Sequence, residues 1–228
     1  MDSMDRRLDM DNLKQRHYIF IDPTNIHDDI NDNGVLNDIK SIHKKHYVNN
    51  EVLRYYSYTD IALLLKDFNE ELFNLYKQLN YNYAALLADI GRYIILYNYG
   101  GIYHDLKYMS TKKMVDYLYT IPNDIQFIAE EHPVENYRVR NTNIVALKKN
   151  AYFFLNVLDK ITIKLKNSHD AHGPNAMFEI GSGIYIEECK NQIKYPFFNT
   201  QMLIFDEYIY MKNIKRWQAT FEPIFRKE

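Results

Sequence analysis

Short apolar runs alternate with longer amphipathic segments along most of the sequence, and this alternation limits the folds that the chain can adopt. Apolar runs bounded by turn residues match buried strands, and apolar residues three and four apart match helices with one buried face. The predicted strands are 18–21, 52–58, 102–103, 125–129 and 143–147, and the predicted helices are 59–66, 70–79, 84–97, 151–165 and a short one near residue 176. Strands separated by helices favour an α/β fold with a mostly parallel central sheet and flanking helices. The helical stretch at 59–81 is predicted to form a small insertion over the sheet.

The composition is that of a folded globular chain. Of 228 residues, 46% are hydrophobic and 25% are charged, which is enough to bury a core. No internal repeat, linker or low-complexity block divides the sequence. We therefore predict one domain at residues 17–228, preceded by a flexible and highly charged arm at residues 1–16.

Charge and cysteine content exclude several classes of protein. The 28 Lys and Arg residues against 30 Asp and Glu residues leave no excess of positive charge for a phosphate backbone, so we expect no nucleic acid among the partners. Cys189 is the single cysteine, which excludes an internal disulfide and a cysteine-based zinc site and fits a cytoplasmic location. The apolar stretches fall short of the roughly 20 residues of a membrane span, so membrane association is expected to be peripheral at most.

The densest group of chemically informative residues follows the start of the predicted helix 84–97. Asp89 and Arg92 are one helical turn apart, so they form either a surface ion pair, worth about 0.2–0.5 kcal/mol, or a charged pair that faces a cleft. A double glycine ends the helix, and Asp105 follows the next short strand. Ligands of parallel sheets bind at the edge formed by the carboxyl ends of the strands, where a carboxylate can bind sugar hydroxyls or a metal ion. The alternative is that Asp105 is a simple turn residue.

The ordered string Ala-Asp-x-x-Arg-Tyr-x-x-Leu-x-x-x-Gly-Gly-Ile-Tyr-x-Asp, at residues 88–105, resembles the sugar-binding region of glycosyltransferase family 32. Relatives include bacterial capsule and lipopolysaccharide transferases, yeast initiating mannosyltransferases and clostridial glucosylating toxins. The resemblance implies a Rossmann-like fold of GT-A type. It also implies transfer of a hexose from a UDP- or GDP-sugar to a hydroxyl acceptor, with retention of configuration.

The same resemblance assigns residues to the donor site. Asp89 and Arg92 match the residues that bind the donor sugar, and Asp105 matches the first Asp of the Asp-x-Asp signature. The matched string also brings Gly100, Gly101 and Tyr103 into the predicted donor site.

Two aromatic residues extend the predicted donor site. Phe20 resembles the family's aromatic residue at the first strand, which stacks on the nucleobase; an ordinary core phenylalanine is the alternative. Trp217 resembles a C-terminal tryptophan near the donor phosphates, although the serine expected two residues before it is missing.

Four residues are predicted on the acceptor side. Asn143 resembles an asparagine before the family's long helix, and Gly173 with Pro174 resembles a turn before a helix near the acceptor. Glu130 ends a predicted strand, where its carboxylate could serve as a general base.

The departure from the family pattern is Lys107, which stands where the second Asp of the signature would bind a divalent cation. Three interpretations stay open. Lys107 can replace the metal as a fixed cation beside the diphosphate, so that it and Asp105 form the catalytic pair. The site can instead have lost turnover and only bind a nucleotide sugar. Finally, Asp105 alone can hold Mn²⁺ or Mg²⁺ weakly.

The expected partners are a nucleotide-sugar donor and a glycan or lipid-linked glycan acceptor, such as a capsule or lipopolysaccharide intermediate at the inner face of a bacterial membrane. A toxin-like transferase that modifies a host protein is the enzymatic alternative. Outside the matched string, we expect His43 and His46 to lie on a solvated face and His104 to point away from Asp105. The adjacent acids Glu187 and Glu188 are expected to be solvated.

Overall fold

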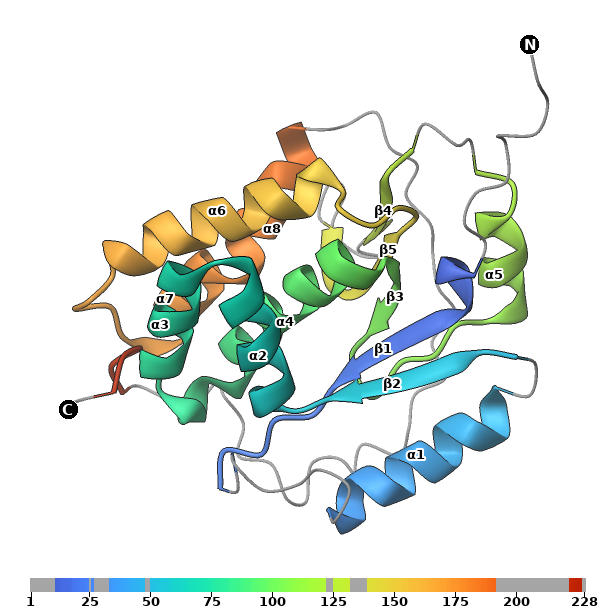
Figure 1. Ribbon diagram of the computed structural model, residues 1–228, viewed down its shortest axis with the longest axis horizontal. Helices are drawn as coiled ribbons and strands as arrows, with labels where there is room; N and C mark the ends of the chain where they lie inside the picture. Colours follow the sequence, from blue (N-terminus) through green and yellow to red (C-terminus); the bar gives the residue numbers. More distant parts are fainter. Residues whose placement is uncertain are drawn as a thin grey trace.

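The computed structural model describes residues 11–24, 26, 33–47, 50–121, 125–131, 139–191 and 222–226. Its strands are β1 (Gln15–Ile19), β2 (Val52–Tyr56), β3 (Gly101–His104), β4 (Phe127–Glu131) and β5 (Val139–Ala146). They form one sheet in the order β2-β1-β3-β5-β4 (Figure 1). Strands β2, β1 and β3 are parallel, and β5 is antiparallel to both of its neighbours. The prediction of a mostly parallel central sheet is confirmed.

Helices cover both faces of this sheet (Figure 1). The α-helices are α1 (Gly34–His46), α2 (Tyr58–Phe68), α3 (Glu70–Gln78), α4 (Ala84–Tyr99), α5 (Lys112–Leu118), α6 (Tyr152–Lys166), α7 (Gly173–Ile180) and α8 (Ser182–Asn191), with 3-10 turns η1 (Asn12–Lys14) and η3 (Tyr81–Tyr83). On one face, α2 to α4 and α6 to α8 pack into the largest apolar core; on the other, α1 and α5 each cover a smaller one. None of the helices in the described ranges combines the length and hydropathy that crossing a membrane requires.

Side chains of successive strand residues enter different cores, as the pleat of a strand dictates. Tyr103 of β3 points into the large core, whereas its neighbour Ile102 packs with α5. In β1, Ile19 enters the large core and Tyr18 packs against α1. The two faces of the sheet are therefore separate environments, and a residue's position in its strand decides which one it meets.

The junction between α4 and β3 depends on two glycines. Gly100 and Gly101 have φ angles of +65° and +87°, a backbone region that other residues rarely adopt. A Cβ atom at Gly101 would lie 2.9 Å from Nε2 of His17 and 3.0 Å from the backbone oxygen of Asn12. The chain leaves the helix at the double glycine, as predicted, and enters β3 within one residue.

The structure corrects the predicted start of the folded region. The flexible arm was expected at residues 1–16. Residues 1–10 lie outside the described part of the chain. Asn12, Leu13 and Arg16, however, are buried in η1 and β1. The fold thus includes at least six residues of the expected arm. Helices α1, α5 and α8 were also not predicted.

Candidate active site

Three charged side chains meet at the carboxyl end of β3. Arg92 places its Nη2 atom 2.8 Å from Oδ1 of Asp89 and 3.5 Å from Oδ1 of Asp105. The side chains of Asp89 and Arg92 are only 6% and 5% exposed, whereas that of Asp105 is 29% exposed. The interpretation of Asp89 and Arg92 as a surface ion pair is therefore wrong. Asp105 is the member of this cluster that meets solvent.

Arg92 is fixed by contacts on every side of its guanidinium group. Its Nε donates to the backbone oxygen of Ala88 at 3.3 Å, and its Nη1 donates to the backbone oxygen of Asn141. The guanidinium carbon lies 4.7 Å from the ring centroid of Tyr103, a cation–π contact. The Tyr103 hydroxyl donates to Oδ1 of Asp105 at 2.8 Å. Tyr103, predicted from the sequence, therefore links the arginine to the exposed carboxylate.

Asp89 is held by two segments that are distant in sequence. The side-chain amide of Asn141 in β5 donates to its Oδ1 atom at 2.8 Å, and the backbone N–H of Ser182 donates to its carboxylate. A Cβ atom at Gly181 would lie 2.3 Å from Oδ2, so the close approach of this turn requires glycine. Ser182 begins α8, and a helix amino terminus stabilises a carboxylate.

Burial nevertheless dominates the titration of Asp89. It raises the pKa of this carboxyl group to about 6, against the opposing effect of the Arg92 charge, and the charge of Asp105 raises it further. Asn141, Gly181 and Ser182 were not among the predicted site residues. No local motif marks them, because they reach Asp89 only through the tertiary fold.

Lys107 lies in the turn that Asp105 begins. The backbone N–H of Tyr108 donates to the oxygen of Asp105 at 2.8 Å, and Nζ of Lys107 lies 5.3 Å from the ring centroid of Tyr108. Leu106 between them is buried, whereas Asp105 and Lys107 are partly exposed. The structure gives Lys107 no ion pair with any described residue. A carboxylate and an ammonium group that forms no ion pair with the described residues thus lie two residues apart at the edge of the sheet.

The remaining predicted donor residues lie around this cluster or outside the described chain. Gly100 accepts a hydrogen bond at its backbone oxygen from Nε2 of His17, at 2.9 Å, which fixes the turn into β3. Phe20 is 4% exposed and packs with Leu36, Ile39 and Leu106, as the core alternative expects. Its contact with a nucleobase stays a prediction. Trp217 lies outside the described residues.

Asn143, Gly173 and Pro174, predicted on the acceptor side, make their described contacts away from the cluster. Asn143 is 1% exposed and accepts from Nδ1 of His104 at 2.6 Å, on the α1 and α5 side of the sheet; His104 itself points away from Asp105, as expected. Gly173 and Pro174 begin α7, where the Gly173 N–H donates to the Tyr83 hydroxyl at 2.9 Å. Glu130 lies in β4 beside a register shift, and its side chain is not described.

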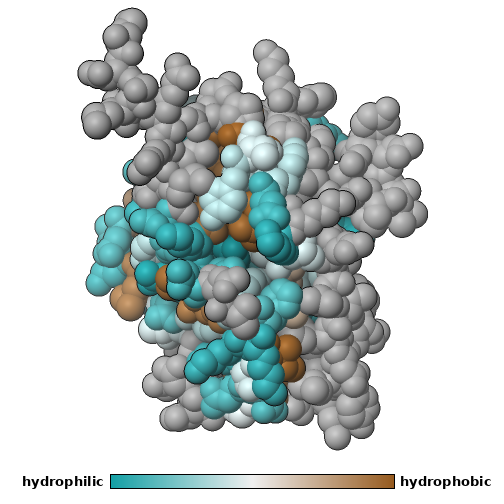
Figure 2. Space-filling model, turned by 90° about the vertical axis from the view of Figure 1, so that its right-hand side faces the viewer, coloured by the Kyte–Doolittle hydropathy of each residue, from teal (hydrophilic) through white to brown (hydrophobic). Residues whose placement is uncertain are grey.

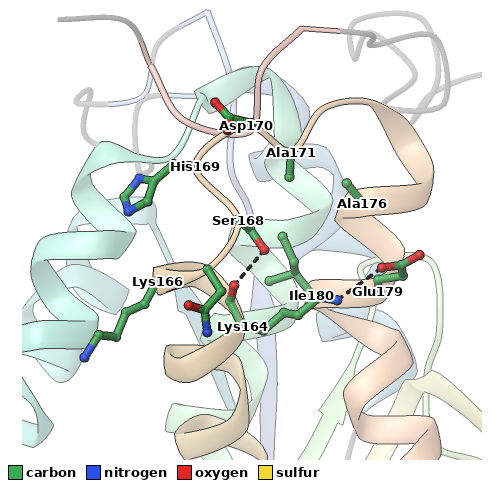
Figure 3. Close-up of a pocket in the computed structure, with 10 residues that line it drawn as sticks. Lys164, Lys166, Ser168, His169, Asp170, Ala171, Ala176, Glu179 and Ile180 are labelled. Atoms are coloured by element: carbon green, nitrogen blue, oxygen red, sulfur yellow. Dashed lines mark hydrogen bonds and ion pairs between the residues drawn. The ribbon is translucent and has the colours of Figure 1, made fainter.

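A cavity of about 380 Å³ lies elsewhere, between the end of α6, the loop that follows it and α7 (Figure 3). Several of its polar side chains already have partners: Lys164 lies 3.2 Å from Glu179, Lys166 lies 2.7 Å from Glu71, and the Ser168 hydroxyl donates to the backbone oxygen of Lys164 at 2.6 Å. Neither Asp89, Arg92 nor Asp105 lines it. This cavity is separate from the charged cluster.

A divalent cation has few ligands in the described part of the site. No group of three or more His, Cys, Asp or Glu side chains in the described residues is arranged to hold a metal ion. Asp105 is the candidate ligand, and its Oδ1 atom already accepts from Tyr103 and faces Arg92. A cation at Asp105 would therefore need most of its ligands from a bound diphosphate and water.

Comparison with known proteins agrees with the resemblance read from residues 88–105. A search of curated sequences gives no match. Among solved structures, the chain is similar to the PaToxG glycosyltransferase, with a TM-score of 0.50 and 17% identity over 79% of this chain and 69% of that chain. This likeness supports the GT-A type of fold. The model of the family described as "glycosyltransferase sugar-binding region containing DXD motif" matches residues 1–131, which include α4, β3 and the turn with Lys107. Because this match spans more than half of the 228 residues, the chain belongs to that glycosyltransferase family.

Proposed function

We propose that the protein transfers a hexose from a UDP- or GDP-sugar to a hydroxyl acceptor at the edge of the sheet marked by Asp105. The observation that carries this proposal is the buried Asp89–Arg92 pair, which holds an exposed carboxylate in a fixed place. Asp105 is partly exposed, and one of its oxygens accepts a hydrogen bond from the Tyr103 hydroxyl. The carboxylate retains capacity to accept further hydrogen bonds from sugar hydroxyls. Asp89 and Arg92, both almost fully buried, position it and complete the sugar-binding wall.

In the proposed reaction, the bond between the sugar C1 and the diphosphate oxygen breaks, and a bond from C1 to the acceptor oxygen forms. The acceptor proton passes to the leaving phosphate oxygen, so no strong protein base is needed. Attack on the face from which the nucleotide leaves gives the proposed retention of configuration.

Lys107 is proposed to stabilise the leaving nucleoside diphosphate. Negative charge grows on this group as the glycosidic bond breaks, and a fixed cation in a cleft stabilises it. Two observations support this role: Lys107 shares the turn with Asp105, and it forms no ion pair with the described residues. A Mn²⁺ or Mg²⁺ ion held by Asp105 and the diphosphate is the alternative.

For the acceptor we propose a glycan or lipid-linked glycan, such as a capsule or lipopolysaccharide intermediate, met in the cytoplasm or at the inner face of the membrane. A host protein, as in toxin-like relatives, is the competing acceptor. The likeness to the PaToxG glycosyltransferase concerns the fold and does not select between them. Parallel assays with glycan and protein acceptors, each with the same labelled donor, distinguish the two.

The first test is nucleotide release from a panel of UDP- and GDP-sugars, in EDTA and then with manganese. We expect release in EDTA, because Lys107 supplies the charge that a metal would otherwise supply. Release only with manganese would support the metal alternative. No release and no binding of any donor, measured by calorimetry, would overturn the proposed function, whereas binding without release would identify a nucleotide-sugar-binding homologue.

A further inference from the structure

Arg16 is a buried arginine in β1 without a carboxylate partner among the described residues. It is 1% exposed, and its Nε atom has no hydrogen-bond partner in the described part of the chain. Its Nη1 atom donates to the backbone oxygens of Leu13 and Gln15, and its guanidinium carbon lies 5.7 Å from the ring centroid of Tyr47. A buried charge costs free energy unless hydrogen bonds and an opposite charge compensate it. Within the described ranges, only two carbonyl groups and one ring contact the guanidinium, and no carboxylate balances its charge.

Arg16 lines a cavity of about 470 Å³ near the amino ends of β1 and β2. The walls come from η1, the end of α1, the residues just before β2, and α5. Figure 2 views the molecule from the side of α5, where hydrophilic side chains predominate among the coloured residues. The volume lies in the range of about 300–1,000 Å³ that is typical of small-molecule sites. Tyr47, Val115 and Tyr119 add apolar surface to the wall.

The other charges of this wall favour a ligand with one anionic group. Lys14 and Lys112 are each paired with a carboxylate, at 2.8 Å and 2.7 Å respectively. Asp11 and Asp116 thus compensate the two lysines, and Arg16 is the cation of this wall that has no carboxylate partner among the described residues. A second anionic group would meet repulsion from the carboxylates of Glu51 and Asp116, whereas a single one can pair with Arg16.

We propose that this cavity binds a small organic anion whose single phosphate or carboxylate group pairs with Arg16. The guanidinium fork suits such planar or tetrahedral oxyanions, because it can donate two hydrogen bonds at once. The apolar part of the ligand packs against Tyr47, Val115 and Tyr119 of the cavity wall.

The anion site is distinct from the proposed donor site. Arg16 lies beside Ile102 in the parallel pairing of β1 and β3, and its cavity opens near the strands' amino ends, whereas Asp105 follows the carboxyl end of β3. The segment that begins at Asp105 also reaches the cavity, because Ser110 lines it. One loop therefore borders both sites, on different edges of the sheet.

The test is calorimetric titration of the full chain with inorganic phosphate and, separately, with acetate at constant ionic strength. We expect saturable binding of at least one of them; phosphate alone would indicate a phosphate ester, and acetate alone a carboxylate. Arg16→Gln should weaken binding by at least about tenfold, as loss of a charge-assisted hydrogen bond predicts. Val115→Phe should block anion binding, because the larger side chain fills the cavity although Arg16 is still present. Lys149→Gln, which removes one exposed positive charge outside the cavity, should bind like the wild type.

Amide chemical shifts of the wild-type chain give a readout that does not depend on the variants. Saturation with the bound anion should shift the amides of Ser110 and Thr111 more than those near Asp89. Absence of saturable binding of both anions would overturn the proposal. So would unchanged binding in Val115→Phe, or shifts confined to the Asp89 cluster, which would place the anion at the donor site instead.

Discussion

At the scale of single residues, the buried pair of Asp89 and Arg92 makes a prediction about stability. Asp89→Ala would leave the guanidinium of Arg92 buried, with Asp105 at 3.5 Å as its remaining carboxylate. We expect the free energy of unfolding in urea to fall by about 3–5 kcal/mol, the cost of breaking a buried ion pair. The control is Asp116→Ala, which breaks the exposed pair with Lys112 and should cost less than about 1 kcal/mol. Equal losses in the two variants would contradict the role given to burial.

The pKa of Asp89 makes a second prediction at this scale. Burial raises it from its ordinary value of 3.8 to about 6, so the folded protein binds this proton more tightly than the unfolded chain. The contribution of this group to stability is therefore full below about pH 4 and is lost as the pH rises through about 6. Relative to Asp89→Asn, which does not titrate, the wild type should gain melting temperature as the pH falls across this window. A constant difference between the two proteins would show that the pKa is not raised.

Spacing in the sequence places Asp89 and Arg92 on one helix face and Asp105 after a short strand, whereas Tyr103 is predicted only through the family resemblance. It cannot predict the contact with Asn141, because that residue is 52 positions from Asp89 and joins it through the sheet.

The same limit explains two errors. His43 was expected on a solvated face, but it is fully buried, donates to the oxygen of Leu106 at 3.0 Å and has its pKa lowered to about 4 by burial. Glu188, also expected to be solvated, is 3% exposed and pairs with Lys160.

At the scale of elements, the turn that follows β3 carries the proposed cation. Lys107→Gln should lower the rate of nucleotide release in EDTA by about 10²-fold. This is the typical effect of removing one group that stabilises the negative charge developing in a transition state. Lys149→Gln is the matched control, since it removes the same charge from an exposed loop residue. Equal rates in the wild type and in Lys107→Gln would remove Lys107 from the mechanism.

The junction of α4 and β3 gives a prediction about stability, tested with a pair of glycine-to-alanine variants. Gly101→Ala should destabilise the fold by about 1–3 kcal/mol, because alanine is strained at φ +87° and its Cβ would lie 2.9 Å from His17 Nε2. Gly34→Ala should be neutral or stabilising, since a Cβ atom there meets nothing within 4 Å at the start of α1. Urea unfolding measures both. A Gly101→Ala variant as stable as Gly34→Ala would contradict the requirement for glycine.

The helices that were predicted and those that were missed do not differ simply in how many residues they bury: α3 buries three and was predicted, whereas α1 buries three and was missed. Helix α4 buries most of its central residues and ends at a double glycine, so both its face and its end are visible in the sequence. Helix α1 buries Leu36, Ile39 and His43 at helical spacing, but His43 stands in a lysine-rich stretch and was expected on a solvated face. The role of this helix becomes visible only when Tyr18 of β1 and Phe20, the residue after β1, pack against it.

At the scale of the whole molecule, the sequence predicts the layers but not the order of the strands. Alternation of helices and strands favours a layered α/β fold, whereas the reversed direction of β5 depends on pairings between distant strands. That reversal brings Asn141 beside α4, so part of the candidate site is a consequence of topology rather than of a local motif.

The segment 222–226 joins distant parts of the chain and carries the last prediction. The backbone oxygen of Ile224 accepts from Asn80 N–H at 2.7 Å, its own N–H donates to Ala171 at 2.9 Å, and its side chain is fully buried in the large core. Ile224→Ala should therefore lower the free energy of unfolding by about 2–5 kcal/mol, the cost of a cavity in a core.

The control is Ile163→Ala on α6, because this isoleucine is 60% exposed and its loss should change stability by less than about 0.5 kcal/mol. Urea unfolding followed by tyrosine fluorescence and by circular dichroism measures both variants. If segment 222–226 is part of one cooperative unit, both signals of Ile224→Ala shift together to lower urea. An early transition in one signal alone would mean that this segment and the helices it contacts unfold separately from the sheet.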